Sequence, residues 1–136
     1  MMLYRLAILF WVLILIAACG SPDPVADLMR NRWQLIEING QPPLTGQQSI
    51  TIIFTTSDRL SGFSGCNTYG GSYRLDGATI AISDLITTFI ACSDPIGAQE
   101  IAFHQALQAA THYEVNAGVL SLVDDQGAVV LRFQAV

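Results

Sequence analysis

Most of the chain consists of short segments in which apolar and polar residues alternate or β-branched residues cluster. Segments of this kind, bounded by turn residues such as the Asn39-Gly40 and Asp76-Gly77 pairs, are typical of strands and hairpins. We therefore expect about seven to eight strands. Their approximate ranges are residues 32–38, 49–56, 59–63, 72–75, 78–83, 113–116, 119–123 and 128–133.

One segment has the periodicity of a helix instead. Its apolar residues recur on one helical face: Ile96, Phe103, Leu107 and Ala110. Residues 93–95 before it, Ser-Asp-Pro, offer a capping side chain followed by proline at the first helical position. The pattern predicts a helix over residues 95–110. Neighbouring strands with one helix predict an α+β domain, a mostly antiparallel β-sheet with the helix packed on it.

The length of the chain after residue 27 limits the number of domains that it can form. Residues 28–136 are long enough for one small domain with its own hydrophobic core, but not for two, so we expect one domain. We also expect the protein to be a monomer. Large aromatic residues at predicted strand or helix positions should fill this core: Trp33, Phe54, Phe103 and Phe133.

The N-terminus has the features of an export signal. Arg5 precedes an uninterrupted apolar run at residues 6–18, which is shorter than the roughly 20 residues that a membrane-spanning helix needs. Residues 16–19, Ile-Ala-Ala-Cys, close the run and resemble the lipobox of bacterial lipoproteins. We therefore expect residues 1–18 to be a signal peptide. The alternative is a plain secretory signal followed by an incidental cysteine.

By the same resemblance, Cys19 becomes the first mature residue and bears the acyl chains that anchor the protein stably to a membrane. Residues 19–27 are mostly polar and contain prolines, so we expect them to form a short tether. Gly20 rather than aspartate follows Cys19, which favours the outer membrane in a host with two membranes. We expect a lipid-anchored protein on the extracytoplasmic side of the cell envelope.

Removal of the leader leaves an acidic protein. The mature chain has five arginines, no lysine and eleven acidic residues, a net charge of −6. Nucleic acids and anionic lipid surfaces are bound by basic faces, so we expect neither as a partner. Attachment to the membrane is therefore expected through the lipid alone.

Residues 61–75 are rich in glycine, and we expect them to shape the sheet rather than to catalyse a reaction. Four glycines lie too close together for an uninterrupted strand, which favours a bulged or sharply bent strand pair: Gly62, Gly65, Gly70 and Gly71. Ser64 lacks the second glycine of a nucleophile elbow, because residue 66 is cysteine. The mature chain also has no lysine for a phosphate-binding loop.

Cys66 and Cys92 are the only cysteines of the mature chain once Cys19 bears lipid. Export places them in an oxidising compartment, where paired thiols persist as disulfides, so we expect a bond between them. Two buried free thiols, or a reactive or metal-binding thiol, are the alternatives.

No group of residues has the spacing of a metal or catalytic site. The candidate ligands include no C-x-x-C or H-x-x-x-H pair: Cys66, Cys92, His104 and His112. Asp124 and Asp125 belong to a predicted turn. We expect no metal, no cofactor and no catalytic residue, and we expect Asn67 to hydrogen-bond local backbone and hold the glycine-rich loop.

Together these features resemble the META domain of HslJ-like bacterial lipoproteins over nearly all of residues 30–134. The most specific part of the match is the family's structural signature: Gly62, Gly65, Cys66, Asn67, Tyr69 and Gly71. Further matching positions include Trp33, Tyr73, Thr88, Ala91, Cys92, Glu100, Phe103, Tyr113 and Phe133. Ile90 departs from the family pattern, which usually has methionine there, but an exchange of methionine for isoleucine preserves apolar volume.

The resemblance implies a compact, mostly antiparallel β fold with a helix. It also implies a role in the cell envelope, because members are linked with heat shock, stress response, antibiotic tolerance and secretion without an established enzymatic activity. We expect a non-enzymatic, membrane-anchored module that binds an envelope protein or a small apolar ligand. The alternatives are a module that inhibits an extracytoplasmic protease, and an envelope thiol or serine hydrolase that uses Cys66 or Ser64.

Overall fold

The computed structural model describes residues 20–44 and 48–136. The expected signal peptide and Cys19 lie outside the described residues. Within these two ranges, neither helix combines the length and the apolar character that crossing a membrane requires.

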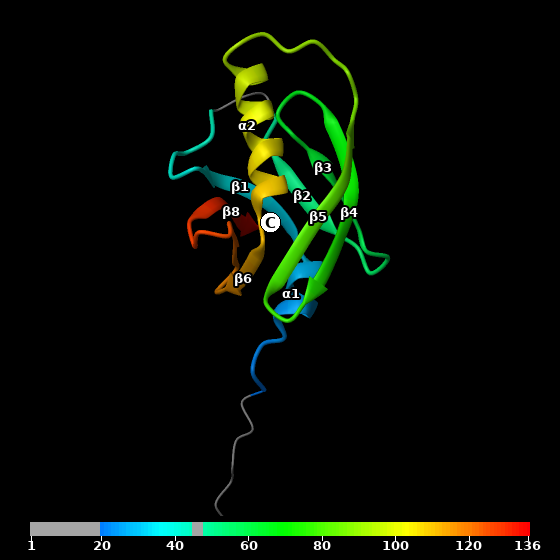
Figure 1. The fold of residues 1–136 in the computed structure, drawn as a ribbon, viewed down its shortest axis with the longest axis vertical. Helices are drawn as coiled ribbons and strands as arrows, with labels where there is room; N and C mark the ends of the chain where they lie inside the picture. Colours follow the sequence, from blue (N-terminus) through cyan, green and yellow to red (C-terminus); the bar gives the residue numbers. More distant parts are fainter. Residues whose placement is uncertain (1–19, 45–47) are drawn as a thin grey trace, which may run out of the picture.

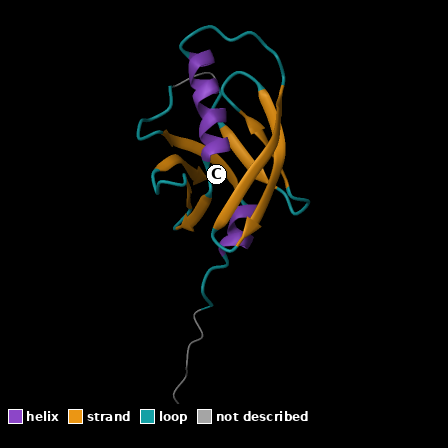
Figure 2. Ribbon diagram, in the orientation of Figure 1, coloured by secondary structure: helices purple, strands orange, loops and turns teal. Residues whose placement is uncertain are grey.

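Eight strands form one sheet in which each strand pairs antiparallel with the next (Figures 1 and 2). The last strand also pairs with the first, so the sheet closes into a barrel. Two helices accompany it, and the α+β fold with about eight antiparallel strands is confirmed. In chain order the elements are α1 (Pro24–Arg30), β1 (Arg32–Ile38), β2 (Thr51–Phe54), β3 (Arg59–Phe63), β4 (Thr68–Asp76), β5 (Thr79–Thr87), α2 (Ile96–Ala109), β6 (His112–Asn116), β7 (Val119–Val123) and β8 (Val129–Ala135).

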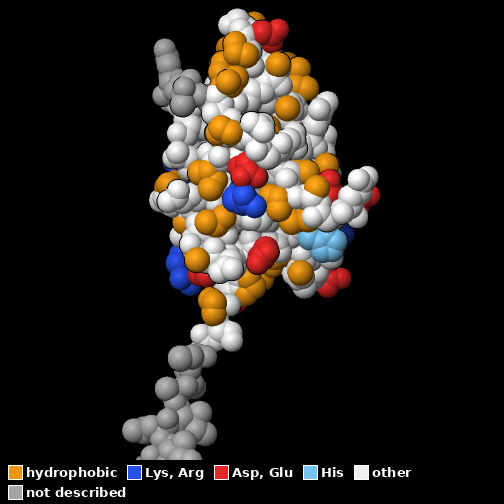
Figure 3. Space-filling model, turned by 90° about the vertical axis from the view of Figure 1, so that its left-hand side faces the viewer, with side chains coloured by type: hydrophobic (Ala, Val, Ile, Leu, Met, Phe, Trp, Pro, Cys, Tyr) orange, Lys and Arg blue, Asp and Glu red, His pale blue; other side chains and the backbone are white. Residues whose placement is uncertain are grey.

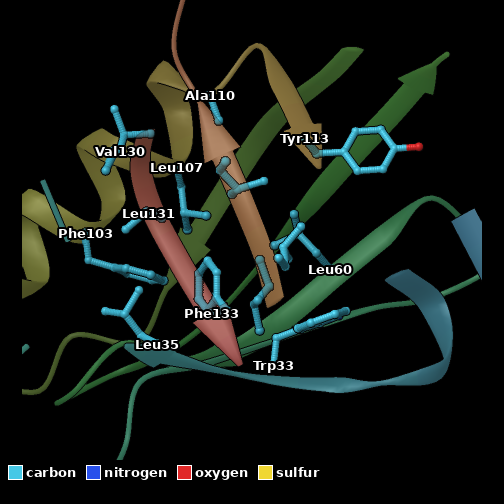
Figure 4. Packing of buried hydrophobic residues seen from close by; sticks show 14 of the residues in the cluster. Trp33, Leu35, Leu60, Phe103, Leu107, Ala110, Tyr113, Val130, Leu131 and Phe133 are labelled. Carbon is cyan, nitrogen blue, oxygen red and sulfur yellow. The ribbon is translucent and has the colours of Figure 1, made fainter. Parts of the chain in front are cut away.

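Alternation along the strands builds a core inside the barrel. The four aromatic residues predicted to be buried are each at most 1% exposed: Trp33, Phe54, Phe103 and Phe133. Phe103 comes from α2 and packs edge-on against Phe133 of β8, with ring centroids 6.4 Å apart (Figure 4). Helix and sheet therefore share one hydrophobic core.

Helix α2 lies beside the weakest seam of the barrel. Strands β5 and β6 pair through a single residue couple, Thr79 with His112, whereas β4 and β5 pair along almost their whole length. The helix connects these two strands in the chain and packs against β5, β8 and β1. Beyond Thr79, the outer edge of β5 has no strand partner within the described ranges.

The start of α2 differs in detail from the expectation. The helix spans Ile96–Ala109, close to the predicted range, but Pro95 is the N-cap residue rather than the first helical residue. No side chain caps this end. Instead, the backbone carbonyl of Ser93 accepts a hydrogen bond from the N–H of Gly97 at 3.1 Å.

Helix α1 is absent from the sequence prediction, which assigns residues 24–27 to the tether. The sequence did contain its start signal, because Pro24 is the first helical residue and the Asp23 carboxylate accepts a hydrogen bond from the N–H of Val25 at 3.0 Å. So short a helix is unstable in isolation. Its stability comes from burial of Leu28 and from the Trp33 indole, whose Nε1 donates to the Leu28 carbonyl at 2.9 Å.

The glycine-rich segment forms β3, a connecting loop and β4. Contrary to the expectation, β4 runs without interruption from Thr68 to Asp76. The predicted bulge is nevertheless present, because the register between β4 and β5 shifts where Gly71 lies opposite both Asp84 and Leu85. Bulges increase strand bending and twist locally, which suits a sheet that closes on itself.

Two phenylalanines provide a matched test of the core. Phe133 is fully buried and Phe89 is 97% exposed. We expect Phe133→Ala to lower the free energy of unfolding by about 3 to 5 kcal/mol, because it removes a large side chain from a packed core. Phe89→Ala should change it by less than about 0.5 kcal/mol. Urea denaturation of both variants checks this, and equal effects would contradict the described core.

Candidate functional site

A groove runs between the end of β5 and helix α2, and we call it the α2 groove. Residues 85–91, from the end of β5 and the loop after it, form one wall. The other wall comes from successive turns of α2: Glu100, Ile101, His104, Gln105 and Gln108. Asn67 also lines the groove, whose volume of about 570 Å³ lies in the range of small-ligand pockets.

The α2 groove gathers much of the exposed apolar surface of the protein. Among the described residues, seven large apolar side chains are exposed, and four of them line this groove: Ile86, Phe89, Ile90 and Ile101. A cluster of exposed apolar residues of this kind marks an interaction site more often than isolated ones do. Figure 3 shows a different face, on the left-hand side of Figure 1: hydrophobic side chains gather toward its upper end, and its Lys and Arg side chains lie lower down.

Asn67 holds the loop wall of the groove in place. Its Oδ1 accepts hydrogen bonds from the backbone N–H of Ile90 at 2.7 Å and from the Thr88 hydroxyl at 2.8 Å. Its Nδ2 donates to the Ile90 carbonyl at 3.2 Å and to Glu100 Oε1 at 2.7 Å. An amide offers two donors and two strong acceptor positions, so this side chain, only 3% exposed, is fully satisfied.

This arrangement revises the expected role of Asn67. We expected hydrogen bonds to local backbone, but the partners lie more than 20 residues away, in the loop after β5 and in α2. The role remains structural in character. Because the Ile90 N–H requires an acceptor and the Glu100 carboxylate requires a donor, the partners also define which way the amide points.

Glu100 joins the helix to the same network. Its Oε2 accepts hydrogen bonds from the backbone N–H of Asn67 at 2.9 Å and from the hydroxyl of Ser64 at 2.6 Å. Burial acts to raise the pKa of Glu100, but the bonds from Ser64 and Asn67 and the attraction of His104 outweigh it and hold the pKa below its usual value of 4.5. The carboxylate is therefore ionised at neutral pH.

His104 lies one helical turn further along the same wall. Its Nε2 is buried and has no hydrogen-bond partner among the described residues. Burial lowers the pKa of His104 from 6.5, and Glu100 opposes that shift only in part, so the imidazole is neutral at neutral pH. The ring packs edge-on against Tyr69 with centroids 5.3 Å apart.

A disulfide joins Cys66 to Cys92, with the Cα atoms 6.2 Å apart. It links the loop before β4 to the loop after β5, next to the bonds that Asn67 makes. The carboxylate of Glu100 lies within 4.8 Å of both sulfur atoms. Disulfide sulfurs are not thiolates, so this cluster does not form a ligand set for a metal ion.

The glycines and tyrosine of the expected signature have packing roles. A Cβ atom at Gly62 would overlap the carbonyl oxygen of Thr51, which accepts a hydrogen bond from the Tyr69 hydroxyl at 2.9 Å. Glycine at position 62 therefore leaves room for a buried tyrosine to join β2 and β4. Gly65 lies in the loop before β4 with a φ of +101°, and Gly71 lies at the bulge.

The remaining sequence candidates are not brought together. Ser64 is fully buried, with its hydroxyl also within 2.8 Å of the Asn67 carbonyl oxygen. His112 is exposed beside Thr111, with Nδ1 2.9 Å from the threonine hydroxyl. Asp124 accepts hydrogen bonds from the backbone of Gln126 and Ala128, which confirms its place in a turn.

The sequence analysis singled out Asn67 and His104 but missed most of the other residues that line the α2 groove. Glu100 and Thr88 were matched to the family pattern without a chemical role, and Ile86, Phe89 and Ile101 were not singled out. The signal was weak, because an apolar residue beside a strand or on a helix predicts burial by default. Only the three-dimensional arrangement shows that these side chains remain exposed.

Removal of the Asn67 amide should destabilise the protein. Asn67→Ala leaves the Ile90 backbone and the Glu100 carboxylate without partners, and we expect a loss of about 2 to 4 kcal/mol in the free energy of unfolding. Asn116→Ala, at an exposed asparagine, is the matched control and should cost less than about 0.5 kcal/mol. Chemical denaturation at neutral pH measures both, and a fully stable Asn67→Ala protein would exclude the role described here.

Glu100 should make the stability depend on acid pH. The pKa of Glu100 is lower in the folded than in the unfolded chain. The ionised carboxylate therefore contributes fully to the free energy of unfolding above a pH of about 4.5, and this contribution is lost as the pH falls through the lower pKa of the folded state. The difference in stability between the wild type and Glu100→Gln should therefore be largest near pH 7 and shrink below pH 4.5. Denaturation curves across this range test it, and a constant difference would contradict it.

The disulfide should stabilise the fold by constraining the unfolded chain. The cysteines are 26 residues apart, and the chain-entropy model gives about 3.5 kcal/mol for a loop of this size. We expect the double variant Cys66→Ser/Cys92→Ser to lower the melting temperature by more than about 10 °C. Peptide mapping of the unreduced wild type should show the pair joined, and two freely alkylated thiols would reject the bond.

Comparisons with known proteins agree with this architecture. A search of solved structures found an NMR structure of a protein from Burkholderia xenovorans that is 31% identical, with a TM-score of 0.64, in a match covering 85% of this chain and 92% of that one. A second NMR structure is 20% identical with a TM-score of 0.63, covering 78% and 89%. A crystal structure of a DUF4847 family protein from Bacteroides vulgatus ATCC 8482 is 18% identical with a TM-score of 0.60, covering 81% and 96%.

The last two similarities concern the fold alone. A search of curated proteins found no match. The family model described as the META domain matches residues 26–136, which include every strand of the barrel and helix α2. This chain therefore belongs to the META domain family.

Proposed function

We propose that this protein is a lipid-anchored, non-enzymatic binding module of the bacterial cell envelope, which supports tolerance of envelope stress or antibiotics by binding a partner or an apolar ligand. The observation on which the proposal rests is the α2 groove, where Ile86, Phe89, Ile90 and Ile101 are each more than 60% exposed. A protein in water keeps apolar side chains exposed together at a cost, which occupation of the groove would remove.

The polar groups of the groove favour binding over catalysis. Ser64 is buried and bonded within the Asn67–Glu100 network, so its hydroxyl is not accessible to a substrate. The cysteines form a disulfide, which excludes a thiolate nucleophile while it is intact. The polar side chains of this network act on one another and hold the groove walls together.

A second candidate function is inhibition of an extracytoplasmic protease. Phe89 is 97% exposed in the loop after β5. The next part of this loop is held in place, because Ile90 bonds to Asn67 and Cys92 is joined to Cys66 by the disulfide. A constrained loop with an exposed aromatic residue suits the pocket of a protease that cleaves after aromatic residues. Slow, saturable inhibition of such a protease, lost in Phe89→Ala, would favour this function, whereas rapid cleavage after Phe89 would exclude it.

The anchor is tested in the native host. The wild-type protein should incorporate radiolabelled fatty acid and fractionate with membranes, and Cys19→Ala should abolish the labelling. Cys92→Ser is the matched control, because it removes a different cysteine and should leave the lipid in place. Unlabelled wild-type protein in the medium would show that the leader is a plain secretory signal.

The binding role is tested by complementation. Deletion of the gene should sensitise cells to heat or to apolar antibiotics, and the wild-type gene should restore tolerance. We expect Ile101→Glu to fail although the protein folds and accumulates, because it places a charge on the groove wall. Ile36→Glu, at an exposed position of β1, is the control and should complement. Full complementation by the groove variant would reject the α2 groove as the functional site.

A further inference from the structure

We propose that the occupant of the α2 groove is an extended peptide segment of another protein, which adds a strand to the free edge of β5. This inference rests on the proposed binding function and specifies its partner. The segment pairs with the backbone of Thr87 and Phe89 and packs apolar side chains against the groove. Its charge is neutral or basic.

The free edge follows from the hydrogen bonds on the other side of β5. The N–H of Thr88 donates to the carbonyl of Thr68 at 3.0 Å, and the N–H of Ile90 donates to Asn67 Oδ1 at 2.7 Å. Thr87 is the last residue of β5, and successive strand residues point their backbone groups to opposite edges, so the N–H and C=O groups of Thr87 point away from β4. Phe89 follows β5 and lies between Thr88 and Ile90, whose N–H groups both face the β4 side, so its own backbone groups are inferred to point outward as well. No strand of the described chain pairs with that edge.

An extended peptide suits this edge better than other ligands do. The N–H and C=O groups of Thr87 and Phe89 form a row with the two-residue repeat of a strand, and another strand matches that repeat. Ile101 and Gln105 line the opposite wall, so side chains of the added strand would face them across the groove. A lipid chain would fill the apolar space but would leave the backbone groups of the edge without partners.

The charge of the α2 groove limits which kinds of peptide segment it can bind. Among the residues that line the α2 groove, Glu100 is the only one with a full charge, and none is Lys or Arg. The ionised carboxylate attracts a basic residue and disfavours an acidic segment. For the same reason a second copy of this chain is a poor occupant, because its own groove wall and net charge are acidic.

The position of the groove also fits a partner away from the anchoring membrane. The segment that leads into α1, at the start of the described chain, lies at one end of the barrel, whereas the loop between β5 and α2 lies at the opposite end (Figure 1). A protein anchored through its N-terminus presents this loop outward. A partner protein is therefore better placed to reach the groove than the lipids around the anchor.

The test begins with photocrosslinking in intact cells. A photoreactive phenylalanine analogue replaces Phe89 or Ile101, and Ile36 serves as the control position. We expect adducts at positions 89 and 101, but not at 36, that contain the same short segment of one protein. A lipid adduct would support the binding module but overturn the peptide proposal, and no adduct at either groove position would overturn both.

The mode of binding is then tested with a synthetic peptide of the captured segment and the full-length protein in nanodiscs. Methylation of single peptide nitrogens should weaken binding by about tenfold at every second residue, and by less than about threefold at the residues between, because only alternate N–H groups face β5. Uniform effects along the peptide would overturn strand addition.

A protein variant provides an independent check. Thr87→Pro removes the N–H that points outward, which an edge strand tolerates, and should weaken peptide binding by about tenfold. Thr87→Val keeps the N–H and should bind as the wild type does. Unchanged peptide binding to a folded Thr87→Pro protein would overturn the proposal. If Thr87→Pro fails to fold, the methylation pattern alone decides whether the peptide binds by strand addition.

Discussion

The amide of Asn67 joins three parts of the molecule that are far apart in the sequence. It bonds to the backbone of Ile90 and the hydroxyl of Thr88, and it bonds to Glu100 on α2. A buried polar network is favourable only when every member has its partner, and here the amide is fully satisfied. The loop wall and the helix wall of the groove therefore keep a defined separation because one small side chain connects them.

The seam between β5 and β6 explains why a groove exists at all. The other neighbouring strands of the barrel pair through at least three residue couples, but β5 and β6 pair through one and are separated in the chain by α2. The helix covers the core at the seam through Phe103 and Leu107, both fully buried. It cannot supply a strand's hydrogen bonds, so the far half of β5 keeps an open edge. The same insertion thus closes the core and creates a surface for a partner.

Much of the fold could be predicted from local pattern. The ranges of β1, β3 and β7 agree with the sequence prediction, and α2 differs from it by one residue at each end. These elements have clear periodicity and turn residues at their ends. Helix α1 was missed because its stability depends on Trp33 and on burial of Leu28, contacts that a seven-residue segment does not reveal. Closure of the sheet was missed because it requires the pairing of β1 with β8, almost 100 residues apart.

The sequence by itself determined most of the strands, the long helix, the buried aromatic residues and the membership of the META family, because each depends on local periodicity or on a motif of neighbouring residues. It did not determine that β4 begins at Thr68 or that β5 continues to Thr87, each four residues beyond the predicted range. Only the tertiary structure decided where the groove lies. Whether Ile86, Phe89 or Ile101 is buried depends on which surfaces meet across the seam, and the partners of Asn67 depend on loop positions more than 20 residues away. Exposure and long-range hydrogen bonding are properties of the packed chain, and no local pattern contains them.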